Sequence, residues 1–231
     1  MTARQRGIRV DRLVQNIDRR YRDTSIHLEI TSKCQLACVV CPRTRFPDLV
    51  PKMDMSPDLI TRLAPGFMEV YMCGDHGDPI YHSEFHRVLS ELQEKAPDTR
   101  IVIETNGSGR TEEWWVETAR HLRGKDEVKF NVDGVRSNNH IYRIGSKWDS
   151  IERAMRTLRR ENPDVFMHWR YILMHHNQYT VEEGAALAME IGFDNFSVIE
   201  SSLYSEYEWT RPTREFEDAV LSVRGVFTCP R

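Results

Sequence analysis

Short apolar segments alternate with longer amphipathic segments along most of this chain, and this rhythm restricts the fold more than any other feature. The short segments are rich in β-branched or aromatic residues and predict six strands, at 25–30, 68–73, 100–105, 127–132, 166–174 and 195–201. Apolar residues at helical spacing predict helices over 83–96, 111–124, 146–162, 180–192 and 213–225. Ser83 and Thr111 are the predicted N-caps of the first two helices.

Repeated strand–helix units predict a parallel sheet, because right-handed crossovers place the helices outside it. Both an open doubly wound sheet and a barrel-like sheet meet this requirement. A complete eightfold barrel takes about 250 residues, whereas six units fit into the 231 residues of this chain. We therefore predict an α/β fold, a partial (β/α)6 TIM-like barrel with parallel strands. In either architecture, ligands bind beyond the carboxyl ends of the strands.

Composition narrows the class of protein. A hydrophobic content of 40% suits one globular domain, and a net charge of −3 argues against disorder and against a nucleic-acid-binding protein. The sequence contains no apolar run of the roughly 20 residues that span a bilayer and no apolar signal core at its N-terminus. We therefore predict a cytoplasmic protein without a membrane partner. Its five cysteines are odd in number and clustered, which argues against a disulfide framework.

Cys34, Cys38 and Cys41 lie within eight positions, on the loop that follows the first predicted strand. Cysteine thiolates are the usual ligands of iron–sulfur clusters, so three on one loop can hold three corners of a four-iron cluster and leave one iron open. A structural zinc site is the alternative. Zinc takes four ligands, so it would need to recruit Cys73 or His76.

The spacing of the three cysteines, with three residues and then two between them, resembles the CxxxCxxC loop of the radical S-adenosylmethionine (SAM) superfamily. The resemblance implies a 4Fe-4S cluster whose open iron binds SAM. It further implies that one electron cleaves SAM and releases a 5'-deoxyadenosyl radical, which abstracts a hydrogen atom from the substrate.

Other residues strengthen the resemblance, because they follow successive strands in the order found in the family. Gly77 and Asp78, before Pro79, match its element for the SAM ammonium, although Gly-Asp-Pro is also a common turn. Thr105 belongs to a "TNG" stretch near the SAM site, and Asn131 and Asp133 are expected at the ribose. Arg143 matches an arginine that pairs with the SAM carboxylate, although a surface arginine is an equal alternative.

Three regions are expected in the chain: a basic helical extension over 1–24, the radical SAM barrel over 25–223, and a stub over 224–231. Cys229 resembles the first cysteine of the SPASM or twitch extension of some family members, and one thiol cannot hold an auxiliary cluster. This tail and Arg143 favour modification of a peptide or protein.

Two alternatives remain: modification of a nucleotide, RNA or cofactor precursor, and a non-enzymatic zinc-binding module. The expected partners are a reductant such as flavodoxin or ferredoxin and a peptide or small-molecule substrate. Nucleic acid is not expected.

Overall fold

The computed structural model describes residues 23–50, 52–201 and 210–215, and the backbone of 227–228. Its strands form one sheet in chain order: β1 (Ser25–Leu28), β2 (Glu69–Met72), β3 (Arg100–Thr105), β4 (Glu127–Asn131), β5 (Phe166–Ile172), β6 (Asn195–Ile199) and β7 (Phe227–Thr228). The first six are parallel, and β7 runs antiparallel to β6. The six predicted strands are confirmed, as is the partial barrel, because β1 and β7 stand at opposite ends of an unclosed strand order.

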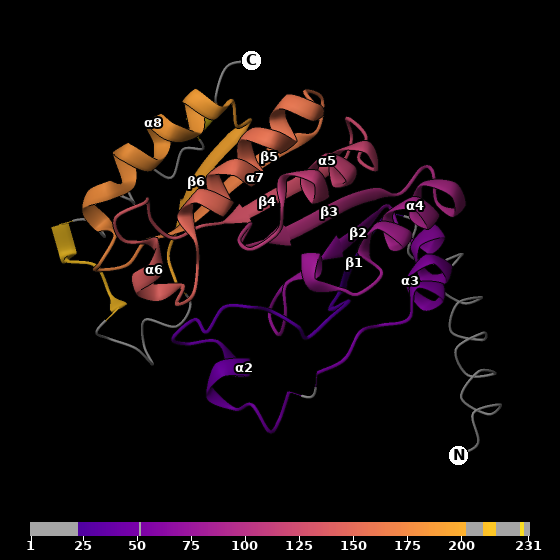
Figure 1. Cartoon of the computed structure of the whole chain (residues 1–231), viewed down its shortest axis with the longest axis horizontal. Helices are drawn as coiled ribbons and strands as arrows, with labels where there is room; N and C mark the ends of the chain where they lie inside the picture. The colour runs from indigo at the N-terminus through magenta and orange to yellow at the C-terminus, as the bar shows by residue number, and fades with distance from the viewer. Residues whose placement is uncertain (1–22, 51, 202–209, 216–226, 229–231) are drawn as a thin grey trace.

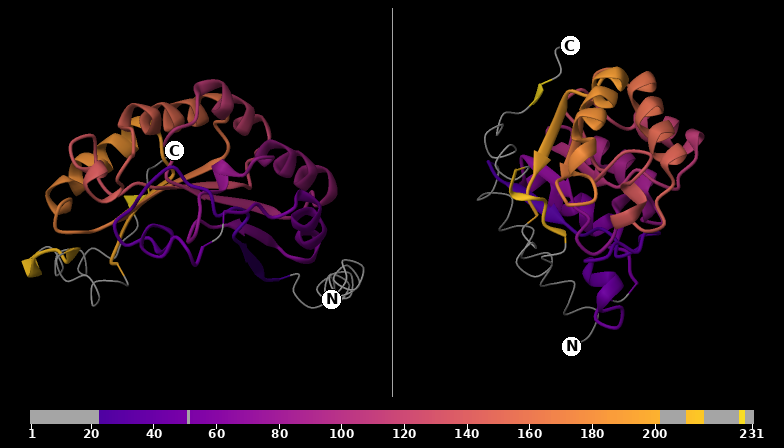
Figure 2. Two further views of the ribbon diagram at one scale, coloured as in Figure 1. Left: turned by 60° about the horizontal axis from the view of Figure 1, so that its bottom comes forward. Right: turned by 90° about the vertical axis from the view of Figure 1, so that its left-hand side faces the viewer.

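Four long helices follow the strands and cover the outer face of the curved sheet (Figures 1 and 2). They are α4 (Phe85–Lys95), α5 (Glu112–Arg120), α7 (Trp148–Glu161) and α8 (Val181–Ile191). Thr111 caps α5 as predicted, because its hydroxyl accepts a hydrogen bond from the Trp114 amide at 3.3 Å. Ser83 does not cap α4. Its hydroxyl instead donates to Asp54 at 2.6 Å, so the predicted cap is wrong.

Shorter helices were not visible in the sequence pattern. They are α2 (Pro42–Arg45), α3 (Pro57–Leu63) and α6 (Asn139–Tyr142), with the 3-10 turns η1 (Ala64–Gly66), η2 (Pro79–Tyr81) and η3 (Gln178–Thr180). α2, η2, α6 and η3 belong to loops that follow the carboxyl ends of β1, β2, β4 and β5. They therefore build the rim at which ligands of such sheets bind.

The strands separate two faces by simple alternation. Trp169 and Tyr171 are fully buried in the core between the sheet and the helices, together with Trp115 of α5. Arg170 lies between the first two along β5 and therefore points to the opposite, concave face. The apolar core therefore lies between the sheet and the helices, and it does not occupy the concave face.

Several predicted features fall outside the described residues: the N-terminal extension over 1–24 almost entirely, most of the helix over 213–225, and the stub with Cys229. Within the described part of the chain, every helix is too short or too polar to cross a bilayer.

Candidate active site

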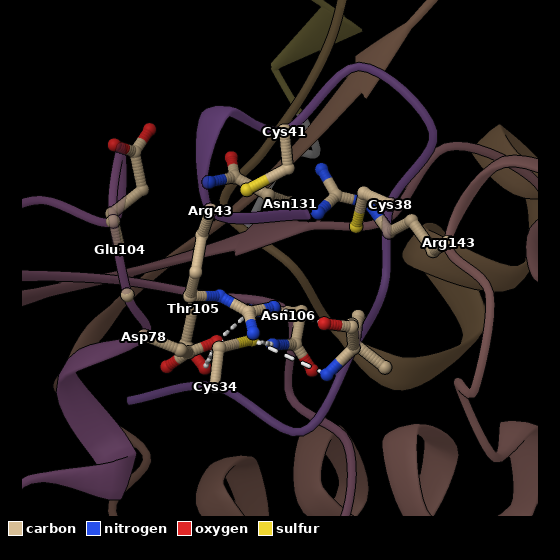
Figure 3. A pocket seen from close by; sticks show the side chains of 13 residues that line it. Cys34, Cys38, Cys41, Arg43, Asp78, Glu104, Thr105, Asn106, Asn131 and Arg143 are labelled. Carbon is tan, nitrogen blue, oxygen red and sulfur yellow. Dashed lines mark hydrogen bonds between the residues drawn. The ribbon is translucent and has the colours of Figure 1, made fainter. Parts of the chain in front are cut away.

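One cavity at the carboxyl ends of the strands gathers the three loop cysteines (Figure 3). Cys34, Cys38 and Cys41 line it, and all three are free thiols. They lie there because the loop after β1 folds back across the rim, where Ala37 N–H donates to Ile144 O at 2.9 Å and Cys41 N–H donates to Cys38 O at 3.1 Å.

The cavity disfavours bare thiolates. Burial raises the pKa of the Cys34 thiol to about 12, and the neighbouring carboxylate of Asp78 adds to this effect. Burial likewise raises the pKa of Cys38, although the Arg143 guanidinium opposes it. These thiols therefore ionise readily only if a positively charged partner such as iron occupies the cavity.

Two guanidinium groups offset negative charge at this position. Arg43 and Arg143 both line the cavity. Arg43 follows Cys41 by two residues, and its side chain turns back to donate a hydrogen bond to Leu36 O in the same loop. A site that combines three soft thiol donors with two cations suits an anionic iron–sulfur cluster and its ligands.

Gly77 and Asp78 connect the loop after β2 to the cysteine loop. The Asp78 amide donates to Lys33 O at 2.9 Å. A Cβ atom on Gly77 would lie 2.8 Å from the Ser32 Cα, so the two backbones approach closely only because residue 77 is glycine. Gly74 and Gly77 line the cavity, so the backbone of this loop forms part of its wall.

The Asp78 carboxylate is buried and faces donors within the protein. It accepts hydrogen bonds from the Ile80 amide at 3.2 Å, the Thr105 hydroxyl at 3.0 Å and the Asn106 amide at 2.8 Å. Burial raises the pKa of Asp78 to about 6, while these hydrogen bonds favour the ionised form and act in the opposite direction. Asp78 and Thr105 both line the cavity, and their hydrogen bond connects the loop after β2 to the end of β3.

Asp133 and Arg143 form a buried ion pair. The Arg143 Nε lies 2.7 Å from one oxygen of Asp133, and the other oxygen accepts the Ile172 amide at 2.9 Å. Asp133 is fully buried and is not among the residues that line the cavity, whereas Arg143 is. The two oxygens of Asp133 thus have partners other than the ribose expected from the sequence.

Asn131 ends β4 and lines the cavity, and its Oδ1 atom is buried without a hydrogen-bond partner among the described residues. Such an atom costs free energy unless a ligand meets it. Asn106 and Glu104 also line the cavity. Asn106 was expected on this rim from the "TNG" stretch, and it donates to the Cys34 sulfur at 3.6 Å, whereas Glu104 was not singled out from the sequence.

The geometry does not suit the zinc alternative. Cys73, one candidate for a fourth ligand, is buried beside Tyr71 and Val102, and neither Cys73 nor His76 lines the cavity. Among the described residues, no three His, Cys, Asp or Glu side chains converge on one point as a single metal ion requires.

Comparison with known proteins identifies the family. The model of the Radical SAM superfamily matches residues 28–188, more than two thirds of the chain. The chain therefore belongs to the radical SAM superfamily. The thiol-lined cavity fits the cofactors of this superfamily, SAM and a 4Fe-4S cluster.

Individual relatives are more distant. The tungsten-containing aldehyde ferredoxin oxidoreductase cofactor-modifying protein of Pyrococcus furiosus is 30% identical over 125 residues, which cover 52% of this chain and 33% of that protein. The Streptococcus suis SuiB structure with bound S-adenosylmethionine has a TM-score of 0.68 at 14% identity and covers 96% of this chain and 53% of SuiB. The chain thus spans about half the length of SuiB and a third of that of the Pyrococcus protein.

A third relative is the radical S-adenosylmethionine methyltransferase TsrM of Kitasatospora setae, solved with cobalamin and a 4Fe-4S cluster bound. It has a TM-score of 0.57 at 15% identity and covers 79% of this chain and 37% of TsrM. At such identities, the solved structures show that the fold is shared.

Proposed function

We propose that this protein cleaves SAM reductively and uses the resulting 5'-deoxyadenosyl radical to abstract a hydrogen atom from a peptide or protein. The observation that carries the proposal is the convergence of Cys34, Cys38 and Cys41 on one cavity that also contains Arg143 and Asn131. When bound, the reduced cluster supplies the electron for cleavage. The protein's own side chains then have to hold SAM in place and keep water from the reacting atoms.

Each cavity residue has a part in this proposal. The three cysteines hold the cluster. Arg143 receives the SAM carboxylate because a guanidinium matches a carboxylate in shape and charge. Asn131 offers its unpartnered Oδ1 to a ribose hydroxyl.

The loop at Gly77 and Asp78 presents backbone carbonyls to the SAM ammonium, while Thr105 steadies Asp78. Asp133 becomes a positioning residue, since its contact is with Arg143.

Support for a peptide substrate comes from the neighbours in fold. SuiB has been solved bound to the precursor peptide SuiA, with a TM-score of 0.65 to this chain. The enzyme anSMEcpe has been solved with AdoMet and a Cp18Cys peptide, with a TM-score of 0.57. The Pyrococcus relative favours a second candidate, modification of a cofactor precursor, because its name describes a cofactor-modifying protein.

The remaining expectations belong to the same proposal. A cytoplasmic location and a reductant such as flavodoxin or ferredoxin suit an enzyme that needs an electron and free thiols. The division into an extension over 1–24, a barrel over 25–223 and a stub over 224–231 stays a prediction.

Iron and sulfide analysis with an optical spectrum tests the cluster assignment. Anaerobically reconstituted protein should hold about four irons per chain, as one cubane requires. Replacement of Cys34, Cys38 or Cys41 by alanine should remove the cluster, whereas Cys73→Ala is the matched control and should keep it. A Cys73 variant without a cluster, beside a loop variant that retains one, contradicts the assignment.

A further inference from the structure

The concave face of the sheet carries charged side chains where a closed barrel would be filled with branched apolar ones. Arg100 near the amino end of β3 pairs with Glu69 and Glu127. Further along the strands, the Lys129 ammonium lies 3.1 Å from the Tyr71 hydroxyl. These groups come from neighbouring strands and lie on one face, so the concave face is a polar surface rather than a core.

Another ion pair, Glu104 with Arg170, lies on this face next to the thiol cavity. This pair joins β3 to β5 across β4. Arg170 of β5 is in register with Asn131 of β4, and its guanidinium reaches Glu104 of β3. Glu104 lines the same cavity as the three cysteines. Asn106, two residues further along, contacts the Cys34 sulfur. Because Glu104 belongs to the cavity wall and Arg170 is paired with it, the pair borders the thiol cavity (Figure 3 shows Glu104).

The accessible member of this pair is the cation. The side chain of Arg170 is 33% exposed, against 8% for Glu104. The Glu104 carboxylate is buried and pairs with Arg170 through its Oε1 atom. The Arg170 Nε atom has no hydrogen-bond partner among the described residues. Two other cations of this face each have two side-chain partners, Arg100 two carboxylates and Lys129 the groups of Tyr71 and Glu127.

We propose that Arg170 is the substrate anchor of this enzyme and that it recognises a carboxylate, with Glu104 holding the guanidinium in position. This inference rests on the proposed function, since it assigns the substrate site of that reaction. A guanidinium binds a carboxylate through two parallel hydrogen bonds, which fixes orientation as well as position. The carboxylate belongs either to an acidic side chain of the substrate or to its main-chain terminus.

Small probes separate these sources. The protein, loaded with its cluster and SAM, is titrated with four compounds and binding is followed by saturation-transfer NMR. N-acetylglutamic acid α-amide offers a side-chain carboxylate and N-acetylglycine a main-chain carboxylate, whereas N-acetylglutamine amide is neutral and N-acetyllysine amide is cationic. We expect one carboxylate probe to bind at least about tenfold more tightly than the neutral probe, as a charge-assisted pair predicts.

Variants then locate the contact. Arg170→Gln should weaken carboxylate binding about tenfold, and Arg170→Lys should have an intermediate effect, because it keeps the charge and loses the planar fork. Glu104→Gln keeps an amide oxygen that can hold the guanidinium in position but removes the competing negative charge, so it should tighten carboxylate binding several-fold. Arg156→Gln on α7, far from the concave face, is the control and should change nothing.

Any one of three results overturns the proposal. In the first, the wild type binds neutral and anionic probes equally well. In the second, it prefers the cationic probe and Glu104→Gln abolishes that preference, and in the third a folded Arg170→Gln protein binds the carboxylate probes as well as the wild type does. The first comparison needs no variant and therefore does not depend on how the variants fold. Cleavage of SAM by the wild type is measured in parallel. A protein that cleaves SAM but ignores carboxylates refutes the anchor alone, and one that binds them without cleaving SAM refutes the proposed function.

Discussion

Replacement of Asp133 by alanine should destabilise the protein more than any change on its surface. Asp133 is fully buried, and the Arg143 side chain that it pairs with is 13% exposed. Removing one partner of such a pair leaves a buried charge without compensation, which costs about 3–5 kcal/mol. The Ile172 amide also loses its acceptor, which adds about 1–3 kcal/mol if water does not replace it.

Urea unfolding of the apoprotein, followed by circular dichroism, measures this cost without the complication of cofactor loss. Asp133→Asn keeps an acceptor for Ile172 and removes only the charge, so it should cost less than Asp133→Ala. The matched control is Asp149→Ala, which breaks the exposed pair with Arg136 and should have little effect. The double variant Asp133→Asn with Arg143→Gln should recover part of the loss, since no unpaired charge remains.

The same variants test the positioning role. Asp133→Asn should weaken SAM binding, because the guanidinium that receives the SAM carboxylate is no longer fixed. A free energy of unfolding for Asp133→Ala as close to wild type as that of Asp149→Ala would refute the reasoning, because it would mean that the buried pair makes no net contribution.

Three further predictions concern the loop backbone, a carboxylate and the number of clusters. Gly77→Ala should reduce both the free energy of unfolding and the iron content after reconstitution, because the new Cβ meets the backbone at Thr31 and Ser32. Gly124→Ala is the control and should keep its iron, because its Cβ meets nothing closer than 3.4 Å. Burial alone would raise the pKa of Asp54, but hydrogen bonds from Lys33, Ser83 and Thr31 hold it below its ordinary value. The stability that this carboxylate contributes is therefore present above about pH 4 and is lost as the pH falls further. The gap in unfolding free energy between wild type and Asp54→Asn should therefore be wide at pH 7 and shrink at pH 3, and a gap that is constant with pH would argue against it. Finally, the chain should bind a single cluster, because the fifth cysteine, Cys229, cannot hold a second one alone; a count near eight irons in the monomer would contradict this.

Features encoded over a few residues were predictable from the sequence. The strands follow from runs of β-branched and aromatic residues, and the thiol loop follows from the spacing of Cys34, Cys38 and Cys41. Their meeting with Thr105 and Asn131 at one cavity followed from the rule that parallel strands place their carboxyl ends together.

Features that depend on long-range contacts were not predictable. Asp133 was expected at the ribose because it follows a strand, but its partners are set by how α6 folds back and by β5, which neither motif nor periodicity reveals. Ser83 had the sequence position of a helix cap, yet Asp54, 29 residues earlier, offers it a stronger, charge-assisted acceptor. The Glu104–Arg170 pair joins residues on β3 and β5, and it appears only once strand register is known.

The most direct test of the account is the fate of SAM. Reconstituted protein, SAM and a strong reductant are incubated without oxygen, and the nucleoside products are separated by chromatography. The account predicts slow formation of 5'-deoxyadenosine by the wild type even without its substrate, and none by a Cys38→Ala protein that cannot hold the cluster. An intact cluster, with SAM shown to bind but with no 5'-deoxyadenosine formed, would contradict the central claim and leave an electron-transfer or structural iron–sulfur protein as the better description.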